Sequence, residues 1–429
     1  MEKLFRLQEH GTTVRKEIIA GLTTFLTMAY ILAVNPGMLS ATGMPIGGVF
    51  TATVIASAIA TLVMAFAANL PVALAPGMGL NAYFTYSVVM GMGYSWQLAL
   101  TAVFLEGILF VILSFFNVRE AIIKTIPANL KKAVAVGIGL FIALIGMANA
   151  KMVVNDAGTI IGLGNLTSGT ALLALIGLAI IIVLYSLKVP GSILIGILVT
   201  TVIGIPLKVT TVAEGFTPFS MPAAPLFFKF EFGNILTFKF FTIFFTFLFV
   251  DIFDTVGTLV GVTTQAGLIN EKGEIPRVKQ ALIADAVGTV AGAALGTSTV
   301  TSYVESTAGV AVGGRTGLTS LSTAVFFIIA LFLSPVFLLI PGAATAPALI
   351  FVGFLMMKSV MGIDFSDPTE GIPAFLAIIM MPFAYSIAEG IVYGILSYVI
   401  LKLVTGKVKD VSVVTWILFV IFVLRFFIK

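Results

Sequence analysis

The sequence predicts an all-α polytopic membrane protein whose fourteen transmembrane segments form a 7+7 inverted repeat. Three observations predict this fold: the composition, the recurrence of long apolar runs, and the distribution of Lys and Arg. Hydrophobic residues make up 59% of the 429 residues and charged residues only 10%, whereas about a quarter of a soluble domain is charged. Apolar runs long enough to cross a bilayer recur along the whole chain.

The apolar runs divide into two sets of seven. The first set lies near residues 18–36, 48–69, 71–90, 96–116, 133–150, 170–187 and 189–207. The second set lies near residues 237–262, 278–296, 297–313, 317–341, 343–360, 371–386 and 388–404. A last apolar run at 413–428 contains Arg425 and is followed by Lys429, so an amphipathic or interfacial helix is favoured over a fifteenth span.

Lys and Arg support this count. With a cytoplasmic N-terminus, seventeen of them fall on the cytoplasmic side: Lys3, Arg6, Arg15, Lys16, Arg119, Lys124, Lys131, Lys132, Lys188, Lys272, Arg277, Lys279, Arg315, Lys358, Lys402, Lys407 and Lys409. Only four fall on the outer side: Lys151, Lys208, Lys229 and Lys239. This bias follows the positive-inside rule. We therefore expect a multi-pass protein of the plasma (cytoplasmic) membrane, with no cleavable signal peptide before the first span.

The two halves also resemble each other in sequence. ASAIATLVMA (56–65) and ADAVGTVAGA (284–293) match at four of ten positions, and Thr27 aligns with Thr255 in the same register. We call this register, in which residue 56 aligns with residue 284, the repeat offset. Because each half holds an odd number of spans, a duplicated half must insert upside down. Inverted repeats are typical of secondary transporters, whose substrate site lies where the repeats meet.

Several classes of protein are disfavoured by composition. Cys is absent, which excludes disulfides and thiol catalysis, and the one histidine, His10, lies in the polar N-terminal segment. No nucleophile–base pair or metal cluster is visible, so neither an enzyme nor a metal or other cofactor is predicted. The net charge of +4 is spread over short loops, which indicates topology rather than nucleic-acid binding.

A few acidic residues are the candidates for transport chemistry, because they fall within predicted spans: Glu106, Asp251, Asp254, Asp285, Glu305 and Glu389. No Lys or Arg is predicted at the same depth. An ionised carboxylate is costly in a low dielectric, so such a group can bind and release a proton or hydrogen-bond a polar solute. Asp285 and Glu389 are placed nearer span ends, where capping or helix packing is expected.

Asp251 and Asp254 are spaced i, i+3 in FLFVDIFDTVGTLVG (247–261), which predicts one face of span 8, with Thr258 one turn further on. The alternative is that each carboxyl bonds neighbouring backbone. Glu106 stands alone in its span, and a hydroxyl on a neighbouring span is the expected partner.

Two spans read as interrupted. TSTVTSYVESTAG (297–309) alternates hydroxyl residues with Val and Tyr before a glycine-rich run, and LAPGMGLNAYF (74–84) contains one Pro and two Gly before Asn81. β-branched residues favour extended backbone. Irregular backbone at membrane depth is tolerated around a polar cavity, and paired breaks in corresponding spans indicate a transporter site. Glu305 is then expected at an extended-to-helix junction; the alternative is a polar patch buried between helices.

Four motifs together resemble a known family: GLTTFLTMAYIL (21–32), APGMGLNAYF (75–84), DIFDTVGTLVG (251–261) and TSTVTSYVESTAGVAVGGRTGL (297–318). They are similar to the azaguanine-type purine permeases, the hypoxanthine/guanine/adenine branch of the nucleobase–cation symporters. The resemblance covers essentially the whole chain, with the motifs in the expected order.

The resemblance implies a division into two domains. Spans 1–4 and 8–11 would form a core, with a short β-strand in each of the broken spans 3 and 10. Spans 5–7 and 12–14 would form a gate. The expected boundaries are an N-terminal segment at 1–17, the core at 18–128 and 237–341, the gate at 129–207 and 343–404, and a C-terminal segment at 405–429.

The resemblance also implies roles for single residues. Substrate binding falls on Asn81, Asp254 and Glu305, and proton coupling on Asp251 and Glu305, with Thr258, Ser306 and Glu106 in support. The related uracil and xanthine branches carry Glu where this chain has Asp254. The uracil branch has His where this chain has Thr258, so that proton-relay role is not carried over.

The expected function is proton-coupled uptake of purine bases (hypoxanthine, guanine or adenine) by alternating access, with H⁺ as the coupling ion. A neutral planar base offers N–H donors and nitrogen or oxygen acceptors that carboxyls, an amide and backbone groups can satisfy. Expected partners are the base, membrane lipid and a second copy in a homodimer. The alternative is an anion transporter or channel of the same 7+7 fold, which acids without basic partners disfavour.

Overall fold

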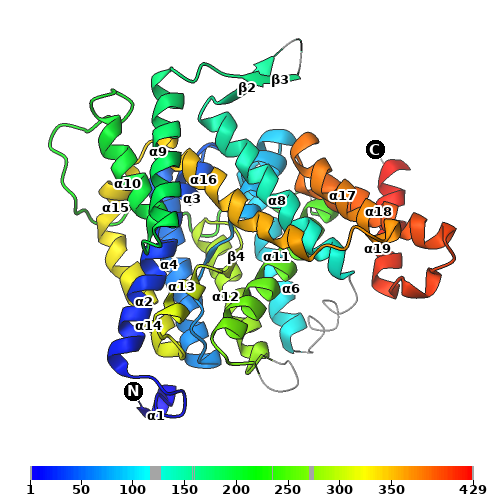
Figure 1. The fold of residues 1–429 in the computed structure, drawn as a ribbon, viewed down its shortest axis with the longest axis horizontal. Coiled ribbons are helices and arrows are strands. Elements are labelled where there is room, and N and C mark those ends of the chain that lie inside the picture. The colour runs from blue at the N-terminus through cyan, green and yellow to red at the C-terminus, as the bar shows by residue number, and fades with distance from the viewer. Residues whose placement is uncertain are drawn as a thin grey trace.

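The computed structural model describes residues 2–115, 127–156, 158, 160–233, 235–269 and 275–427. Within these residues the chain is mostly helical, and a small hairpin projects from the helical bundle (Figure 1). Of the cytoplasmic cations predicted above, Arg119, Lys124 and Lys272 lie outside the described residues.

The first half is built of helices, two π-helical segments and three short strands. In the described part of this half they are α1 (Glu2–Phe5), α2 (Val14–Met28), α3 (Ile31–Ser40), α4 (Ile46–Val63), a π-helical segment (Met64–Ala68), β1 (Leu74–Pro76), α5 (Met78–Ala82), a second π-helical segment (Tyr83–Gly91), α6 (Trp96–Phe115), α8 (Ala128–Asn149), β2 (Val153–Asp156), β3 (Ile160–Leu163), α9 (Gly169–Ser186) and α10 (Ser192–Gly204). The strands β2 and β3 form the projecting hairpin (Figure 1).

The second half repeats the arrangement of a strand and a short helix between long helices. Its main elements are α11 (Phe238–Gln265), α12 (Val278–Leu295), β4 (Val300–Ser302), α13 (Ser306–Ala311), α14 (Gly317–Ala330), α15 (Ser334–Leu338), α16 (Gly342–Met357), α17 (Pro368–Phe383), α18 (Ile387–Val404) and α19 (Val413–Phe427). In both halves the strand and the short helix take the place of the third predicted span.

Every predicted span contains at least one of these elements. In the described part of the chain, ten helical stretches are long and apolar enough to cross a membrane, and α10, α17 and α19 contribute shorter apolar helices. The predicted span at 71–90 contains β1, α5 and the second π-helical segment, and the one at 297–313 contains β4 and α13, so both are interrupted as expected. The chain is a multi-pass helical membrane protein, and the count of fourteen spans stays a prediction.

The first long helix begins before the first predicted span. It starts at Val14 and not at residue 18, because the hydroxyl of Thr13 accepts a hydrogen bond from the backbone N–H of Lys16 and caps the helix. The predicted boundary between the N-terminal segment and the first span, after residue 17, therefore falls inside α2. Glu17, which was assigned to the polar segment, is fully buried.

Glu17, on α2, is hydrogen-bonded to the start of α14. Its carboxylate accepts hydrogen bonds from the backbone N–H groups of Arg315 (2.9 Å), Thr316 (3.3 Å) and Thr319 (3.1 Å). The hydroxyls of Thr316 and Thr319 donate to it as well, at 2.9 and 2.6 Å. A carboxylate is favoured at a helix N-terminus, where backbone N–H groups lack partners within the helix. The contact fixes two helices that are far apart in sequence, since Glu17 and Thr319 are separated by 302 residues.

The helices pack in two groups. In one, α2 packs on α13 and α14, α4 packs on α12 and α14, and α6 packs on α12. In the other, α8 packs on α16 and α17, α17 packs on α18, and α9 packs on α10 and α16. Small residues bring α8 and α16 together: a Cβ added at Gly139 would lie 2.8 Å from the carbonyl oxygen of Gly353. Close backbone approach through small residues is typical of helix packing in membranes.

A pair of threonines shows that the two halves use the same contact. The Thr61 hydroxyl accepts from the N–H of Leu74 at 3.0 Å and lies 3.2 Å from the carbonyl oxygen of the same residue. The Thr289 hydroxyl does the same with Val300, at 3.2 and 3.0 Å. Thr61 and Thr289 are one of the four matches between 56–65 and 284–293. Thr61 therefore hydrogen-bonds to the backbone of β1, and Thr289 hydrogen-bonds in the same way to the backbone of β4.

We expect Thr61→Val and Thr289→Val to destabilise the protein by similar amounts. Valine keeps the shape of threonine but leaves a strand N–H and a carbonyl buried without their partner. Each variant should lower the free energy of unfolding by about 1–3 kcal/mol, measured by unfolding of the purified protein in detergent. Thr264→Val, which removes an exposed hydroxyl that bonds only its own helix, is the control. If only one of the first two variants is destabilised, the two threonines do not have equivalent roles.

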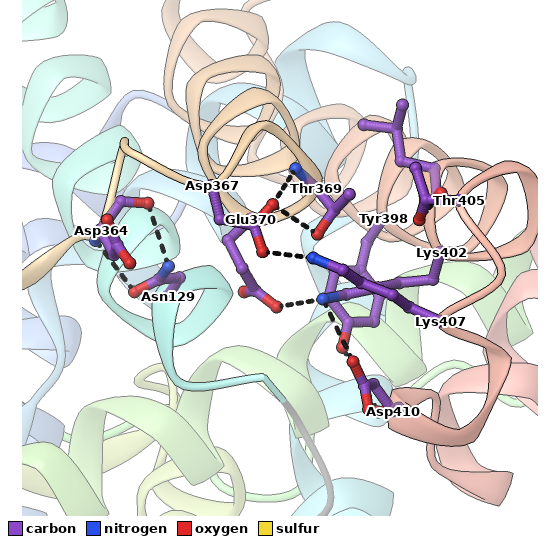
Figure 2. Close-up of polar contacts among 11 residues, drawn as sticks. Asn129, Asp364, Asp367, Thr369, Glu370, Tyr398, Lys402, Thr405, Lys407 and Asp410 are labelled. Atoms are coloured by element: carbon purple, nitrogen blue, oxygen red, sulfur yellow. Dashed lines mark hydrogen bonds and ion pairs between the residues drawn. The ribbon is translucent and has the colours of Figure 1, made fainter.

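An ion-pair cluster fastens the turn after α18 to the start of α17 (Figure 2). The Nζ of Lys402, a residue only 3% exposed, lies 2.8 Å from Glu370 and 3.6 Å from Asp410. The Nζ of Lys407 lies 2.8 Å from Asp367, and its hydrogen bond holds the pKa of that carboxyl well below its usual range. These ion pairs therefore hold the segment that leads into α19 against the start of α17.

The last helix, α19, packs against α18. Its Leu418 and Phe422 are buried, and the ring of Phe422 lies 6.2 Å from that of Phe245 on α11. One face of α19 is thus covered by protein. Its interfacial position stays a prediction.

Candidate functional site

The centre of the candidate site is a pair of short strands. β1 and β4 are antiparallel, with Leu74 opposite Ser302 and Pro76 opposite Val300. Two backbone hydrogen bonds extend the pairing: Gly77 N–H donates to the carbonyl of Thr299 at 2.9 Å, and Tyr303 N–H donates to that of Ala73 at 3.0 Å. The strand β4 lies in the middle of the bundle (Figure 1). The two interrupted spans therefore meet each other inside the protein.

A short helix follows each strand, and the repeat offset holds here. α5 begins at Met78 and α13 begins at Ser306, and these two residues align at the repeat offset. Glu305 lies directly before α13 and Gly77 directly before α5. Glu305 thus occupies the expected junction between extended and helical backbone, and Gly77 is its counterpart in the first half.

The polar residues before Glu305 connect the strand pair to the surrounding elements. The hydrogen bonds join Thr297 to Asn35 (2.9 Å), Ser298 to the side-chain oxygen of Asn81, Thr299 to Glu106 (3.0 Å), Thr301 to Thr255 (2.8 Å), and the Tyr303 hydroxyl to the carbonyl of Pro76 (2.5 Å). Each contact reaches a different part of the first half or α11. This explains why the stretch is so rich in hydroxyls, and it confirms the expected hydroxyl partner of Glu106.

The two acids of α11 have different surroundings, although their spacing predicted a shared face. Asp251 is fully buried, and the Thr255 hydroxyl lies 3.3 Å from its Oδ1. The same hydroxyl lies 2.5 Å from Asp285 on α12. Asp285 is in the middle of α12 rather than near its end, and its contact with Thr255 joins α12 to α11, which agrees with the expected helix packing and not with capping. The carboxylate of Asp254 lies near a different element, the junction between β1 and α5.

Asp254 faces the junction between β1 and α5. A Cβ added at Gly77 would lie 3.5 Å from Oδ2 of Asp254 and only 2.5 Å from the methyl group of Thr301, so the backbone of Gly77 lies close to the Asp254 carboxylate and to β4. Asp254 is half-buried, and its carboxylate makes no hydrogen bond to another residue of the described chain. Thr258, one turn further along α11, is buried.

Glu305 is also half-buried, and one of its oxygens is engaged. The hydroxyl of Tyr30 donates to Oε1 of Glu305 at 2.6 Å. No Lys, Arg or His of the described residues forms an ion pair with Glu305 or Asp254. Two accessible carboxyl groups without a basic partner suit a neutral, donor-bearing solute or a proton, and disfavour an anion.

Asn81 hydrogen-bonds to the strand-pair region and to neither of these carboxyls in the described chain. Its side chain is fully buried, its oxygen accepts from Ser298, and its Nδ2 donates to the carbonyl of Pro76 at 3.4 Å. Ser306 has a similar supporting position, because its hydroxyl accepts from the N–H of Ala73 at 3.0 Å. Both ends of the Asn81 amide are therefore used by the protein in this structure.

Tyr30 and Ser298 are parts of the site that the sequence analysis missed. Tyr30 lies between α2 and α3, at a break within an apolar run, and a polar aromatic residue at such a break is the one local signal. Ser298 was seen only as part of a hydroxyl-rich stretch. In both cases the partner is distant in the chain, 275 residues away for Tyr30 and 217 residues away for Ser298.

The fold and the site together define a polytopic membrane permease. The chain belongs to the permease family whose model matches residues 15–393. It is 43% identical over 425 residues to the adenine permease AdeP of Escherichia coli (strain K12), covering 99% of this chain and 95% of that protein. It is 44% identical over 434 residues to the guanine/hypoxanthine permease PbuO of Bacillus subtilis (strain 168), covering 99% and 100%.

The fold is also similar to a solved structure. The transmembrane domain of a cyanobacterium bicarbonate transporter, BicA, superposes with a TM-score of 0.67 at 15% identity, covering 89% of this chain and 97% of that one. At this identity the likeness concerns the fold alone. The relatives above confirm the predicted family of purine permeases.

Proposed function

We propose that this protein imports purine nucleobases (hypoxanthine, guanine or adenine) across the plasma membrane, with its N-terminus in the cytoplasm. The observation that carries the proposal is the pair of half-buried carboxyls, Asp254 and Glu305, beside the paired strands and without a basic partner among the described residues. The similarity to relatives named as adenine and guanine/hypoxanthine permeases supports the same substrate class.

A purine base matches what these carboxyls offer. Its ring and exocyclic N–H groups are donors, and a carboxyl oxygen accepts up to two hydrogen bonds. Each N–H that is satisfied inside the protein avoids a penalty of roughly 1–3 kcal/mol for a buried group without a partner. Asp254, Glu305 and Asn81 are the proposed substrate residues, with Asn81 acting through the strand pair, where Ser298 and Pro76 hold it.

We propose H⁺ as the coupling ion, with Glu305 and Asp251 as the residues that support coupling. A carboxyl that is neutralised by a proton crosses a low-dielectric region more cheaply than a bare charge. Asp251 would act from behind the site, through Thr255 and Asp285. Glu106 would support the same unit through Thr299.

The direct test is uptake of labelled hypoxanthine, guanine and adenine by cells that express the protein, with and without a protonophore. We expect accumulation of at least one base, and loss of accumulation when the proton gradient is collapsed. Failure to take up any of the three bases would overturn the proposed substrate class. Accumulation that persists without a proton gradient would overturn the coupling ion alone.

We propose alternating access by movement of the core (18–128 and 237–341) against the gate (129–207 and 343–404). The strand pair and its hydrogen bonds form one polar unit, and pulling it apart in lipid would expose backbone groups at several kcal/mol each. The site is therefore better moved whole. The close contact of Gly139 and Gly353 supports a gate that stays packed while the core moves.

Cysteine accessibility tests this movement, because the chain has no native cysteine. Single cysteines replacing Met78 and Val304, on either side of the strand pair, should change their reactivity together when a purine is added. A cysteine replacing the exposed Phe354 of α16 should keep its reactivity. If Phe354→Cys responds to the purine and the other two do not, the moving part is misassigned.

A further inference from the structure

Tyr30 reaches the site from the break between α2 and α3. α2 ends at Met28 and α3 begins at Ile31, and the Tyr30 side chain is only 1% exposed. The end of α2 also approaches the backbone of the site residue, since the Thr27 hydroxyl lies 3.4 Å from the carbonyl oxygen of Glu305. The same short stretch of the first half therefore contacts both the backbone and the side chain of Glu305.

Tyr30 is the one other described residue whose side chain hydrogen-bonds to the carboxyl of Glu305, and it does so at Oε1. At 2.6 Å this hydrogen bond is a close contact, and hydrogen bonds to a carboxylate are among the stronger ones in proteins. No hydrogen bond from another described residue reaches Oε2 of Glu305. A tyrosine ring has few rotatable bonds and is packed here, so its hydroxyl restricts the direction in which Oε2 points.

The inverted repeat indicates that this contact is not needed to build the fold. At the repeat offset the counterpart of Tyr30 is Thr258 and the counterpart of Glu305 is Gly77. Gly77 has no side chain, so the first half closes its strand-to-helix junction without an equivalent contact. The repeat does keep the strand contacts of Thr61 and Thr289. The Tyr30–Glu305 contact is therefore particular to the site.

A second tyrosine of the same region provides a contrast. The hydroxyl of Tyr303 donates to the carbonyl of Pro76 in β1, and the residue is 5% exposed. Its hydrogen bond thus holds one strand to the other and does not reach a carboxyl. Tyr30 and Tyr303 are both buried tyrosines. They differ in the acceptor of their hydroxyl: a side-chain carboxylate for Tyr30 and a backbone carbonyl for Tyr303.

We propose that Tyr30 is a positioning residue for the substrate: its hydroxyl orients Glu305 so that Oε2 faces the base. This rests on the proposed function, because it assumes that Glu305 contacts a purine. The base would then be held by Oε2 of Glu305 and by the two oxygens of Asp254, whose carboxylate has no hydrogen-bond partner in the described chain.

The test is a double-mutant cycle on the binding of the base that the parent protein transports, measured by calorimetry on purified protein in detergent. Tyr30→Phe keeps the ring and removes the hydroxyl, and it should weaken binding about tenfold, as expected for the loss of a hydrogen bond to a charged group. In the Glu305→Ala background, where no carboxyl remains to be oriented, the same change should alter the dissociation constant by less than about twofold.

Uptake kinetics and the matched tyrosine complete the test. Tyr30→Phe should raise KM and largely keep the maximal rate, whereas Tyr303→Phe should lower thermal stability and show no coupling to Glu305→Ala. The proposal is overturned if Tyr30→Phe weakens binding equally with and without Glu305, or if it leaves binding unchanged. If the parent protein binds no purine at all, the proposed function fails instead, which separates the two failures.

Discussion

Glu305→Gln should abolish the accumulation of purine against a gradient while binding of the base survives. Glutamine keeps the shape of glutamate, and its oxygen can still accept from the Tyr30 hydroxyl. It cannot take up and release a proton, so uptake of the base would no longer be linked to the proton gradient. We expect the variant to equilibrate the base at most, with affinity within about tenfold of the parent.

The measurement is accumulation of labelled base at an imposed proton gradient, alongside binding to the purified variant. Glu389→Gln is the matched control, because Glu389 is in the first turn of α18, outside the strand-pair site, and accumulation should persist there. Full gradient-driven accumulation by Glu305→Gln would contradict the assigned role.

Glu17→Ala should be among the most destabilising single changes outside the site. It removes a fully buried carboxylate that accepts five hydrogen bonds from α14 and the residues before it. Three backbone N–H groups and two hydroxyls would lose their partner at once. We expect the free energy of unfolding to fall by about 3 kcal/mol or more, measured by denaturation in mixed detergent micelles.

Glu9→Ala controls for the loss of an acid in the same segment. Glu9 is exposed and lies 3.5 Å from Arg6, which is exposed as well, and exposed ion pairs contribute little. That variant should unfold like the parent. Equal stability of Glu17→Ala and Glu9→Ala would mean that the helix start of α14 is held by something other than Glu17.

The features that the sequence predicted well are those with a local physical signature. Long apolar runs predict helices by length and composition, and the hydroxyl-rich and glycine-rich breaks predict irregular backbone at 74–84 and 297–309. Glu305 could be placed because an acid beside such a break has few other roles. The two breaks could be matched to each other because each interrupts the third span of its half.

The features that were missed depend on tertiary contacts between residues that are far apart in the sequence. Tyr30 and Glu305 are 275 residues apart, and nothing in either segment names the other. The i, i+3 spacing of Asp251 and Asp254 cannot tell which side of α11 faces Asp285 and which faces Gly77, because α12 and β1 decide it. Glu17 was assigned to a polar tail, since its partners, the N–H groups of α14, have no sequence signature.

The strand pair also has a consequence for the order in which the chain is made. β1 is synthesised long before β4, its pairing partner, since Pro76 in β1 and Tyr303 just after β4 are 227 residues apart. At roughly 5–20 residues per second, β1 waits on the order of 10–45 seconds for that partner. During this interval Thr61 can satisfy one edge of β1, and the edge that faces β4 has no strand to pair with. The first half of the protein is therefore made with an open strand edge, and the site is completed only when the second half is inserted.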